Sequence, residues 1–147
     1  MSDGFTGGCL CGSVRFESQT NPVVTGHCHC VDCRKTSGTG HASNLCVPKA
    51  TTNITGDVST YDRPADSGNI ITRAFCPTCG SPVYSFNSAM PEMIFFRASV
   101  LDDPEVFTPQ MAVYRNRAPS WDHADPNIPN FEIMPEGGPE QAIADAG

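Results

Sequence analysis

Eight cysteines in a chain of 147 residues constrain this sequence more than any other feature. Seven of them lie in three short motifs: Cys9-Leu-Cys11-Gly12, Cys28-His-Cys30-Val-Asp-Cys33 and Cys76-Pro-Thr-Cys79-Gly80. In a reducing compartment, closely spaced cysteines are typical of metal sites or reactive thiols rather than disulfides. A domain of this length buries only a modest core, so bound metal would add folding free energy that the chain needs.

Composition and charge narrow the classes of partner. The formal net charge is −7 and the sequence pI is about 4.8, which disfavours a wide nucleic-acid interface because phosphate binding requires a basic face. No apolar run reaches membrane-spanning length. The start, MSDGFTGG, lacks the basic and apolar regions of a signal peptide. We therefore expect a cytoplasmic protein that binds neither nucleic acid nor membrane.

Short apolar runs between turn-forming residues predict a mainly β domain with few helices. The segment from Cys33 to Gly40 is expected to form a helical turn followed by a loop. The predicted strands are Ser13–Glu17, Val23–Thr25, Ala42–Val47, Thr51–Thr55, Ser59–Asp62, Asn69–Phe75, Pro82–Phe86 and Met93–Val100.

The same pattern predicts how these segments are organised. Thr51–Thr55 and Ser59–Asp62 flank Gly56-Asp57 and are expected to pair as a hairpin. Residues 1–8 are interpreted as a glycine-rich leader, and Asp102–Pro139 as an irregular segment whose aromatic residues contact the sheets. We expect one domain over residues 1–147, with a flexible tail after about residue 137.

The outer two motifs each offer two thiolates on a turn, and the glycine after each pair lets backbone N–H groups face sulfur. Four thiolates on zinc form a closed, structural site. We therefore expect a shared metal site on Cys9, Cys11, Cys76 and Cys79. Two independent turns whose thiols never meet, or a disulfide version, are the alternatives.

The middle motif supplies three thiolates, which leave one position of a tetrahedral zinc open unless another side chain closes it. An open position is typical of a catalytic zinc and a closed one of a structural zinc. A thioredoxin-type redox pair is a third interpretation, but it leaves Cys28 unexplained. Cys46 is expected to be a buried strand residue. The candidates for a fourth ligand are His27, His29, His41, Cys46 and His123.

With these motifs assembled, the chain resembles the glutathione-dependent formaldehyde-activating enzyme (GFA) family, whose domain also occurs in centromere protein V. The runs GGCLCGSVRFE, GHCHCVDCRKTSG and FCPTCGSPVY carry the resemblance, in that order and spacing. It extends from about Gly7 to Phe96. Beyond Met111 it rests on Trp121 and the run IPNFEIMPE, and the chain looks shorter than the namesake enzymes.

The resemblance implies an Mss4-like zinc-binding fold of short antiparallel strands with few short helices. It implies two zinc ions, one structural and one catalytic. The structural ion would be held by Cys9, Cys11, Cys76 and Cys79, and the catalytic ion by Cys28, Cys30 and Cys33. The namesake reaction joins glutathione to formaldehyde, gives S-(hydroxymethyl)glutathione and is classed as carbon–sulfur lyase chemistry. A fold carries over between relatives better than a reaction does.

The expected partners are therefore a small thiol such as glutathione and an aldehyde. Zinc would favour the thiolate or polarise the aldehyde oxygen, and the resulting hemithioacetal alkoxide needs a proton. His27, His29 and His41 are the candidate catalytic residues, because imidazole titrates near neutrality. Each could instead be an ordinary solvated or core histidine.

Glutathione carries carboxylates, so an acidic protein needs local cations to bind it. Arg34 and Lys35 directly follow the middle motif and are the expected binding residues, with Arg73 and Arg97 as further candidates. Ordinary surface charge is the alternative for each. Trp121 is expected to wall the pocket or to anchor the core.

Two functions compete at this point. The first is a zinc-dependent carbon–sulfur lyase. The second is a non-enzymatic zinc module that binds a thiol ligand or a protein partner. A protein side chain in the fourth position would favour the module, whereas an open position would favour the enzyme.

Overall fold

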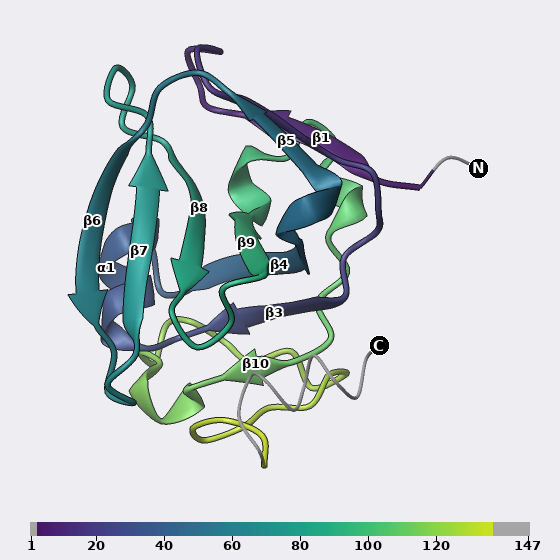
Figure 1. The fold of residues 1–147 in the computed structure, drawn as a ribbon. Coiled ribbons are helices and arrows are strands. Elements are labelled where there is room, and N and C mark those ends of the chain that lie inside the picture. Colours follow the sequence, from purple (N-terminus) through teal and green to yellow (C-terminus); the bar gives the residue numbers. More distant parts are fainter. Residues whose placement is uncertain (1–2, 137–147) are drawn as a thin grey trace.

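The computed structural model describes residues 3–136, which form two β-sheets, one α-helix and several 3-10 turns (Figure 1). The smaller sheet is antiparallel and has the strand order β1-β2-β5. Its strands are β1 (Phe5–Gly8), β2 (Arg15–Ser18) and β5 (Thr52–Thr55). The single helix is α1 (Val31–Ser37), which ends at Gly38 in the left-handed conformation.

The larger sheet has the order β10-β3-β4-β9-β8-β7-β6 and is antiparallel except where β10 joins β3. Figure 1 shows β6, β7 and β8 side by side, with β3, β4 and β10 at the other end of the sheet. The strands are β3 (Val24–Cys28), β4 (Ala42–Pro48), β6 (Ser59–Pro64), β7 (Ile70–Phe75), β8 (Pro82–Asn87), β9 (Met93–Arg97) and β10 (Ala112–Val113). The 3-10 turns are η1 (Lys49–Thr51), η2 (Ala98–Val100), η3 (Pro104–Val106) and η4 (Arg115–Arg117).

The mainly β, antiparallel fold with one short helix confirms the prediction of fold class. The predicted hairpin of Thr51–Thr55 with Ser59–Asp62 is wrong, because β5 pairs with β2 and β6 pairs with β7. At the end of β5, Gly56 has φ +94°, and a Cβ there would lie 2.0 Å from the Ser13 carbonyl oxygen. This close backbone approach, together with the partnership of Phe16 and Ile54 across the strands, outweighs the local turn signal.

Three other local predictions also change. The supposed leader contains β1, because Phe5 is buried in the core and the strand pairs with β2. The strand predicted over Met93–Val100 ends at Arg97 and continues as η2. Trp121 is 62% exposed, so it neither anchors the core nor walls the cavity described below.

The main core lies between the two sheets. Phe16 of β2 stacks on Phe96 of β9 with ring centroids 4.1 Å apart, and Phe5 meets both rings edge-on. Leu45 of β4 and Ile94 of β9 are fully buried in the same cluster. Successive side chains of a strand point to opposite faces. The neighbours of Leu45, Ile94 and Phe96 along their strands therefore face away from the core, and the candidate functional site lies on that opposite face.

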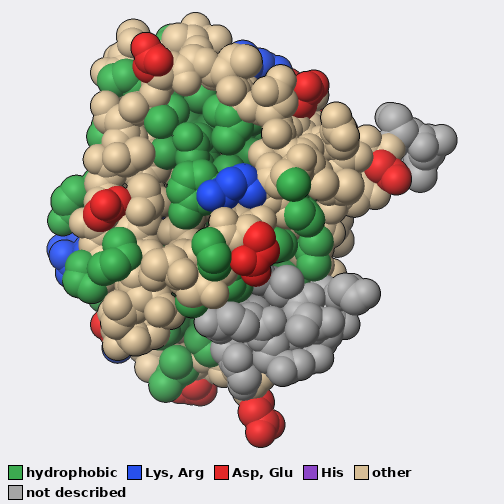
Figure 2. Space-filling model, in the orientation of Figure 1, with side chains coloured by type: hydrophobic (Ala, Val, Ile, Leu, Met, Phe, Trp, Pro, Cys, Tyr) green, Lys and Arg blue, Asp and Glu red, His purple; other side chains and the backbone are tan. Residues whose placement is uncertain are grey.

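The distribution of charge on the surface is consistent with the acidic composition. On the face shown in Figure 2, charged side chains stand singly and do not gather into one basic area. None of the helices within residues 3–136 has the length and apolar character needed to cross a bilayer. One domain over residues 1–147 stays a prediction, and the tail expected after about residue 137 lies outside the described residues.

Candidate metal centres

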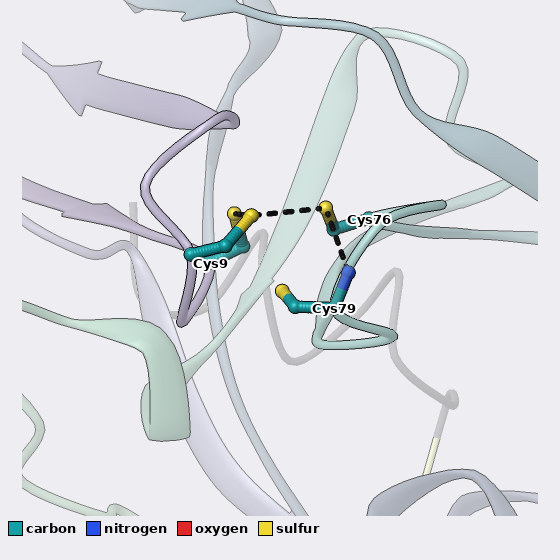
Figure 3. Close-up of side chains that lie close together, drawn as sticks. Cys9, Cys76 and Cys79 are labelled. Carbon is teal, nitrogen blue, oxygen red and sulfur yellow. Dashed lines mark hydrogen bonds between the residues drawn. The ribbon is translucent and has the colours of Figure 1, made fainter.

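Cys9, Cys11, Cys76 and Cys79 come together from two distant turns, and their four sulfurs lie within 4.8 Å of one another. In Figure 3 the sulfurs of the labelled Cys9, Cys76 and Cys79 face a common centre. The sulfur of Cys11 lies 3.6 Å from that of Cys9 and 3.7 Å from that of Cys76. Sulfurs on a tetrahedral zinc, with Zn–S bonds of about 2.3 Å, are about 3.8 Å apart, so this cluster can hold such an ion. We call it the quartet.

Both turns of the quartet have the backbone geometry that the sequence predicts. Gly12 and Gly80 have φ +84° and +79°, a conformation that glycine adopts without strain. The backbone N–H of Val14 points at the Cys9 sulfur, at 3.2 Å, and that of Cys79 at the Cys76 sulfur, at 3.5 Å. All eight cysteines are free thiols. The alternatives of independent turns and of a disulfide are therefore not what the structure shows.

Hydroxyl groups complete the surroundings of the quartet. Ser13 Oγ lies 3.1 Å from the Cys11 sulfur and 3.3 Å from the Cys76 sulfur, and Ser81 Oγ lies 3.2 Å from the Cys79 sulfur. Hydrogen bonds from the side chain and backbone of Ser81 lower the pKa of the Cys79 thiol to about 5. The thiolate form that metal binding requires is thus favoured at this position.

Cys28, Cys30 and Cys33 form a second cluster, which we call the trio, with all three sulfurs within 4.8 Å of one another. Cys28 ends β3, and Cys33 lies on the first turn of α1. Cys30 is the N-cap of α1, and its sulfur accepts the N–H of Cys33 at 3.3 Å. Hydrogen bonds with Cys28 and Cys33 lower the pKa of Cys30 to about 2, whereas hydrogen bonds with Cys30 and Cys33 raise the pKa of Cys28 well above its usual value. The trio therefore presents a ready thiolate.

The trio has no fourth protein ligand within residues 3–136, since no other Cys, His, Asp or Glu there joins its three sulfurs. Cys46, one of the candidates from the sequence, is fully buried on β4 and packs with Met90 and Met93. His123, another candidate, is exposed beyond Trp121. A tetrahedral ion on these three sulfurs would therefore keep one position open.

A cavity of about 540 Å³ lies against the trio, on the face of the larger sheet opposite the core. Its apolar lining includes Met90, Phe95 and Met111. The Oδ1 atom of Asn44, on the same wall, is buried and has no hydrogen-bond partner within the described chain. An acceptor of this kind is satisfied when a bound molecule brings a donor. The cavity is large enough for a tripeptide-sized ligand.

The basic side chains that line this cavity differ from the two that the sequence analysis ranks first for binding a carboxylate. Of the described residues, Arg73, Arg97 and Arg117 line it, whereas Arg34 and Lys35 do not. Arg34 and Lys35 follow Cys33 on α1 by one and two positions, and residues at these spacings do not share a helix face with it.

The histidines predicted from the sequence lie together beside the trio. His27 lines the cavity, and its Nδ1 atom lies 2.8 Å from Ser43 Oγ. Burial, and next the nearby His41 ring, lower the pKa of His27 to about 4, so its ring is neutral at pH 7. The rings of His27 and His41 meet edge-on with centroids 4.5 Å apart.

His29 and His41 both face Asp122, a residue that the sequence analysis does not single out. His41 Nδ1 lies 2.7 Å from Asp122 Oδ2, and His29 Nε2 lies 3.2 Å from the same oxygen. His29 is 2% exposed, and its Nδ1 atom lies 3.2 Å from the Val113 carbonyl oxygen. Neither His29 nor His41 lines the cavity. The sequence has a glycine at position 40, beside His41, and this is its one sign of a close contact there. In the structure a Cβ at Gly40 would lie 2.4 Å from Asp122 Oδ2.

These three residues also form a group whose ligand atoms lie within 4.8 Å of one another. Arg115 Nη1 lies 3.1 Å from His29 Nε2, so a guanidinium already occupies the space beside that nitrogen. The existing hydrogen bonds satisfy the group, and the adjacent positive charge disfavours a metal cation there. We therefore interpret this group as structural.

Comparisons with known proteins agree with this arrangement of cysteines. Residues 4–117 match the family described as glutathione-dependent formaldehyde-activating enzyme. The chain belongs to the GFA family. The resemblance inferred from the cysteine motifs is thereby confirmed, and the matched range includes both the quartet and the trio of this GFA chain.

The chain is similar to one protein in sequence and to another in fold. A Halomonas elongata protein, whose name provisionally gives it the glutathione-dependent formaldehyde-activating function, is 34% identical over 101 residues. The match covers 65% of this GFA chain and 64% of that protein, so it spans less than two thirds of the relative's length. A crystal structure of a Rhodobacter sphaeroides protein is similar with a TM-score of 0.55 and 16% identity, over 86% of this chain and 98% of the other. That likeness concerns the fold alone.

Proposed function

We propose that this chain is a zinc-dependent carbon–sulfur lyase that joins a small thiol such as glutathione to formaldehyde or a related aldehyde. The observation that carries the proposal is the trio without a fourth protein ligand among residues 3–136, beside a cavity of about 540 Å³. Membership of the GFA family, which is named for enzymes that activate formaldehyde, supports the reaction class.

The two clusters have different roles in this proposal. The quartet joins the turn after β1 to the turn between β7 and β8, so a zinc ion there would be structural. The trio would hold the catalytic zinc, because it alone adjoins the cavity. When bound there, zinc supplies Lewis acidity and favours the thiolate form of a thiol.

The cavity residues position the reactants and manage the proton. Asn44 Oδ1 accepts a hydrogen bond from a donor on the substrate, and Arg73 and Arg117 offer cations for its carboxylates. Attack of the thiolate sulfur on the aldehyde carbon forms the C–S bond and leaves an alkoxide that takes up one proton. His27 is the cavity histidine nearest to this chemistry. It relays that proton from water through its ring.

The test is the rate of S-(hydroxymethyl)glutathione formation with purified protein, measured by two-dimensional exchange NMR because the reaction also proceeds without a catalyst. The wild-type protein with its metal should raise the exchange rate in proportion to its concentration. Cys30→Ser should lose that effect and one zinc per chain while it stays folded. Cys46→Ala, which removes a thiol outside both clusters, should keep both.

No dependence of the exchange rate on the wild-type protein would reject the enzyme proposal. Retained zinc and saturable binding of glutathione in that case would favour the second function, a zinc module that binds a thiol without turnover. Loss of glutathione binding in Cys30→Ser would then locate the ligand at the trio.

A further inference from the structure

Arg97 is a buried cation, only 5% exposed, in the middle of the larger sheet. It is the last residue of β9 and pairs with Asn44 across β4. Its Nη2 atom donates a hydrogen bond to Thr36 Oγ1 at 3.0 Å, and this partner carries no charge. A buried guanidinium is costly unless a negative group compensates it. We therefore ask which negative group lies near Arg97.

The other charges on the cavity wall are already compensated in pairs. Asp32 lies 3.2 Å from the Nε atom of Arg63, and Asp66 lies 3.6 Å from Nη2 of Arg117. Among the described residues, Arg73 and Arg97 are the lining cations that form no ion pair with a carboxylate.

The remaining anion on this wall is the trio itself. Arg73 and Arg97 line the cavity together with all three cysteines. Burial lowers the pKa of Arg97, and the negative charge that metal binding places on Cys33, Cys28 and Cys30 opposes that change. The two guanidiniums and the three sulfurs thus form one electrostatic unit.

The formal charges of this unit determine which charge on a fourth metal ligand is favoured. Three thiolates and a divalent ion carry one net negative charge, and two guanidiniums turn this into one net positive charge. A neutral fourth ligand leaves that positive charge buried, whereas an anionic fourth ligand cancels it. The inference rests on the open metal position of the proposed function and deepens it.

We propose that Arg73 and Arg97 balance the charge of the trio and its metal ion, and so make the open position selective for an anionic ligand such as a thiolate. The pair would be a specificity device distinct from any binding of substrate carboxylates. It would act on the reacting sulfur, even in a thiol that has no carboxylate.

Binding to protein whose trio holds Co²⁺ tests this selectivity without any measurement of turnover. The probes are 2-mercaptoethanol, which binds as a thiolate and has no other charge, and imidazole, which binds neutral. Both are titrated at fixed pH and followed by the cobalt absorption bands. In Arg73→Met and Arg97→Met the affinity for the thiol should fall about tenfold or more, since one nearby charge is lost. The affinity for imidazole should stay the same or rise.

Lys49→Met is the charge-matched control. Cys28 pairs with Ala42 at the start of β4, whereas Lys49 directly follows the other end of that strand. The ammonium of Lys49 lies over the Phe86 ring. This variant should bind both probes as the wild type does. Arg97→Lys keeps the charge and should recover most of the thiol affinity.

Equal losses for thiol and imidazole in both methionine variants would overturn the charge-selection proposal. If Arg97→Met does not fold, Arg73→Met decides the question, because Arg73 lies on β7 and is less buried than Arg97. Unchanged thiol affinity in Arg73→Met would then overturn the proposal. A wild-type cobalt protein that binds neither probe would instead refute the open position, and with it the proposed function.

Discussion

The Asp122 carboxylate lies 2.7 Å from Nδ1 of His41, a residue 81 positions earlier in the chain. Through this contact and the one to His29, the irregular segment after β10 holds the loop that carries the trio. His29 stands between Cys28 and Cys30 in sequence, so its anchoring restrains the peptide between two metal ligands. The Asp122 contact thus connects the irregular segment after β10 to the geometry of the trio.

Gly40→Ala should release this contact. A Cβ at Gly40 would lie 2.4 Å from Asp122 Oδ2, so the carboxylate must move away from the histidines. We expect a loss of about 1–3 kcal/mol in the free energy of unfolding, as for an overpacked site. Urea denaturation of the variant measures it. In an Asp122→Gly background, which also removes the Asp122 Cβ at 2.9 Å, the same substitution should cost little, and equal costs in both backgrounds would show that Gly40 acts elsewhere.

Cys76→Ser and Cys30→Ser should differ in their effect on folding. Cys76 is fully buried in the main core, and its loss opens the quartet that joins two distant turns, so thermal unfolding should move to clearly lower temperature. Cys30→Ser should lower the zinc content by one ion per chain with a much smaller shift in Tm. Calorimetry with metal analysis checks both. Similar melting temperatures for the two variants would contradict the division of roles.

The sequence was sufficient to predict the fold class and the grouping of seven cysteines, because metal-ligand spacing is local and the motifs CxC and CxxCG each form on one turn. It ranked Arg34 and Lys35 above Arg73 and Arg97 as the cations beside the trio, and the structure reverses that order. Arg34 and Lys35 are adjacent to the trio in sequence, but α1 directs them away from the cavity. Arg73 and Arg97 reach the cavity only because β7 and β9 belong to the same sheet.

Asp122 could not be predicted for a related reason. It lies in a segment without periodicity, and its partners are fixed by the tertiary path of the chain rather than by a local motif. The predicted hairpin failed because pairing of β5 with β2 buries Phe16 against Ile54, which a local turn signal does not reveal.

Phe96→Ala should be among the most destabilising single substitutions in this chain. Phe96 is fully buried, stacks on Phe16 and meets the rings of Phe5 and Tyr84. We expect a loss of about 3–5 kcal/mol, because the cavity left behind removes apolar contacts with both sheets. Ile133→Ala, at a side chain that is 54% exposed, should change stability by no more than about 0.5 kcal/mol. Chemical denaturation compares the two.

The ion pair of Asp102 with Arg15 should add a pH-dependent contribution to stability. Hydrogen bonds from Arg15 and then Thr6 lower the pKa of Asp102 from 3.8 to about 2. A carboxyl group whose pKa is lowered by folding stabilises the protein above its unfolded pKa. That stability should be lost as the pH falls from about 4 to about 2. Both side chains are nearly half exposed, so the contribution should be at most about 1 kcal/mol.

The measurement is the difference in unfolding free energy between wild type and Asp102→Asn across this pH range. Because both proteins release metal in acid, the difference isolates the carboxylate. It should be largest above pH 4 and shrink toward pH 2. A difference that is constant with pH would show that the pair contributes nothing through ionisation.

The alternation of side chains along β9 has a consequence for how such a protein can diversify. Ile94 and Phe96 belong to the interior between the sheets, whereas Phe95 and Arg97 belong to the cavity wall. Mutations at every second position can therefore reshape ligand preference while the intervening positions keep the scaffold intact. A lineage with this architecture can acquire new substrates by small steps, without first having to regain a stable fold.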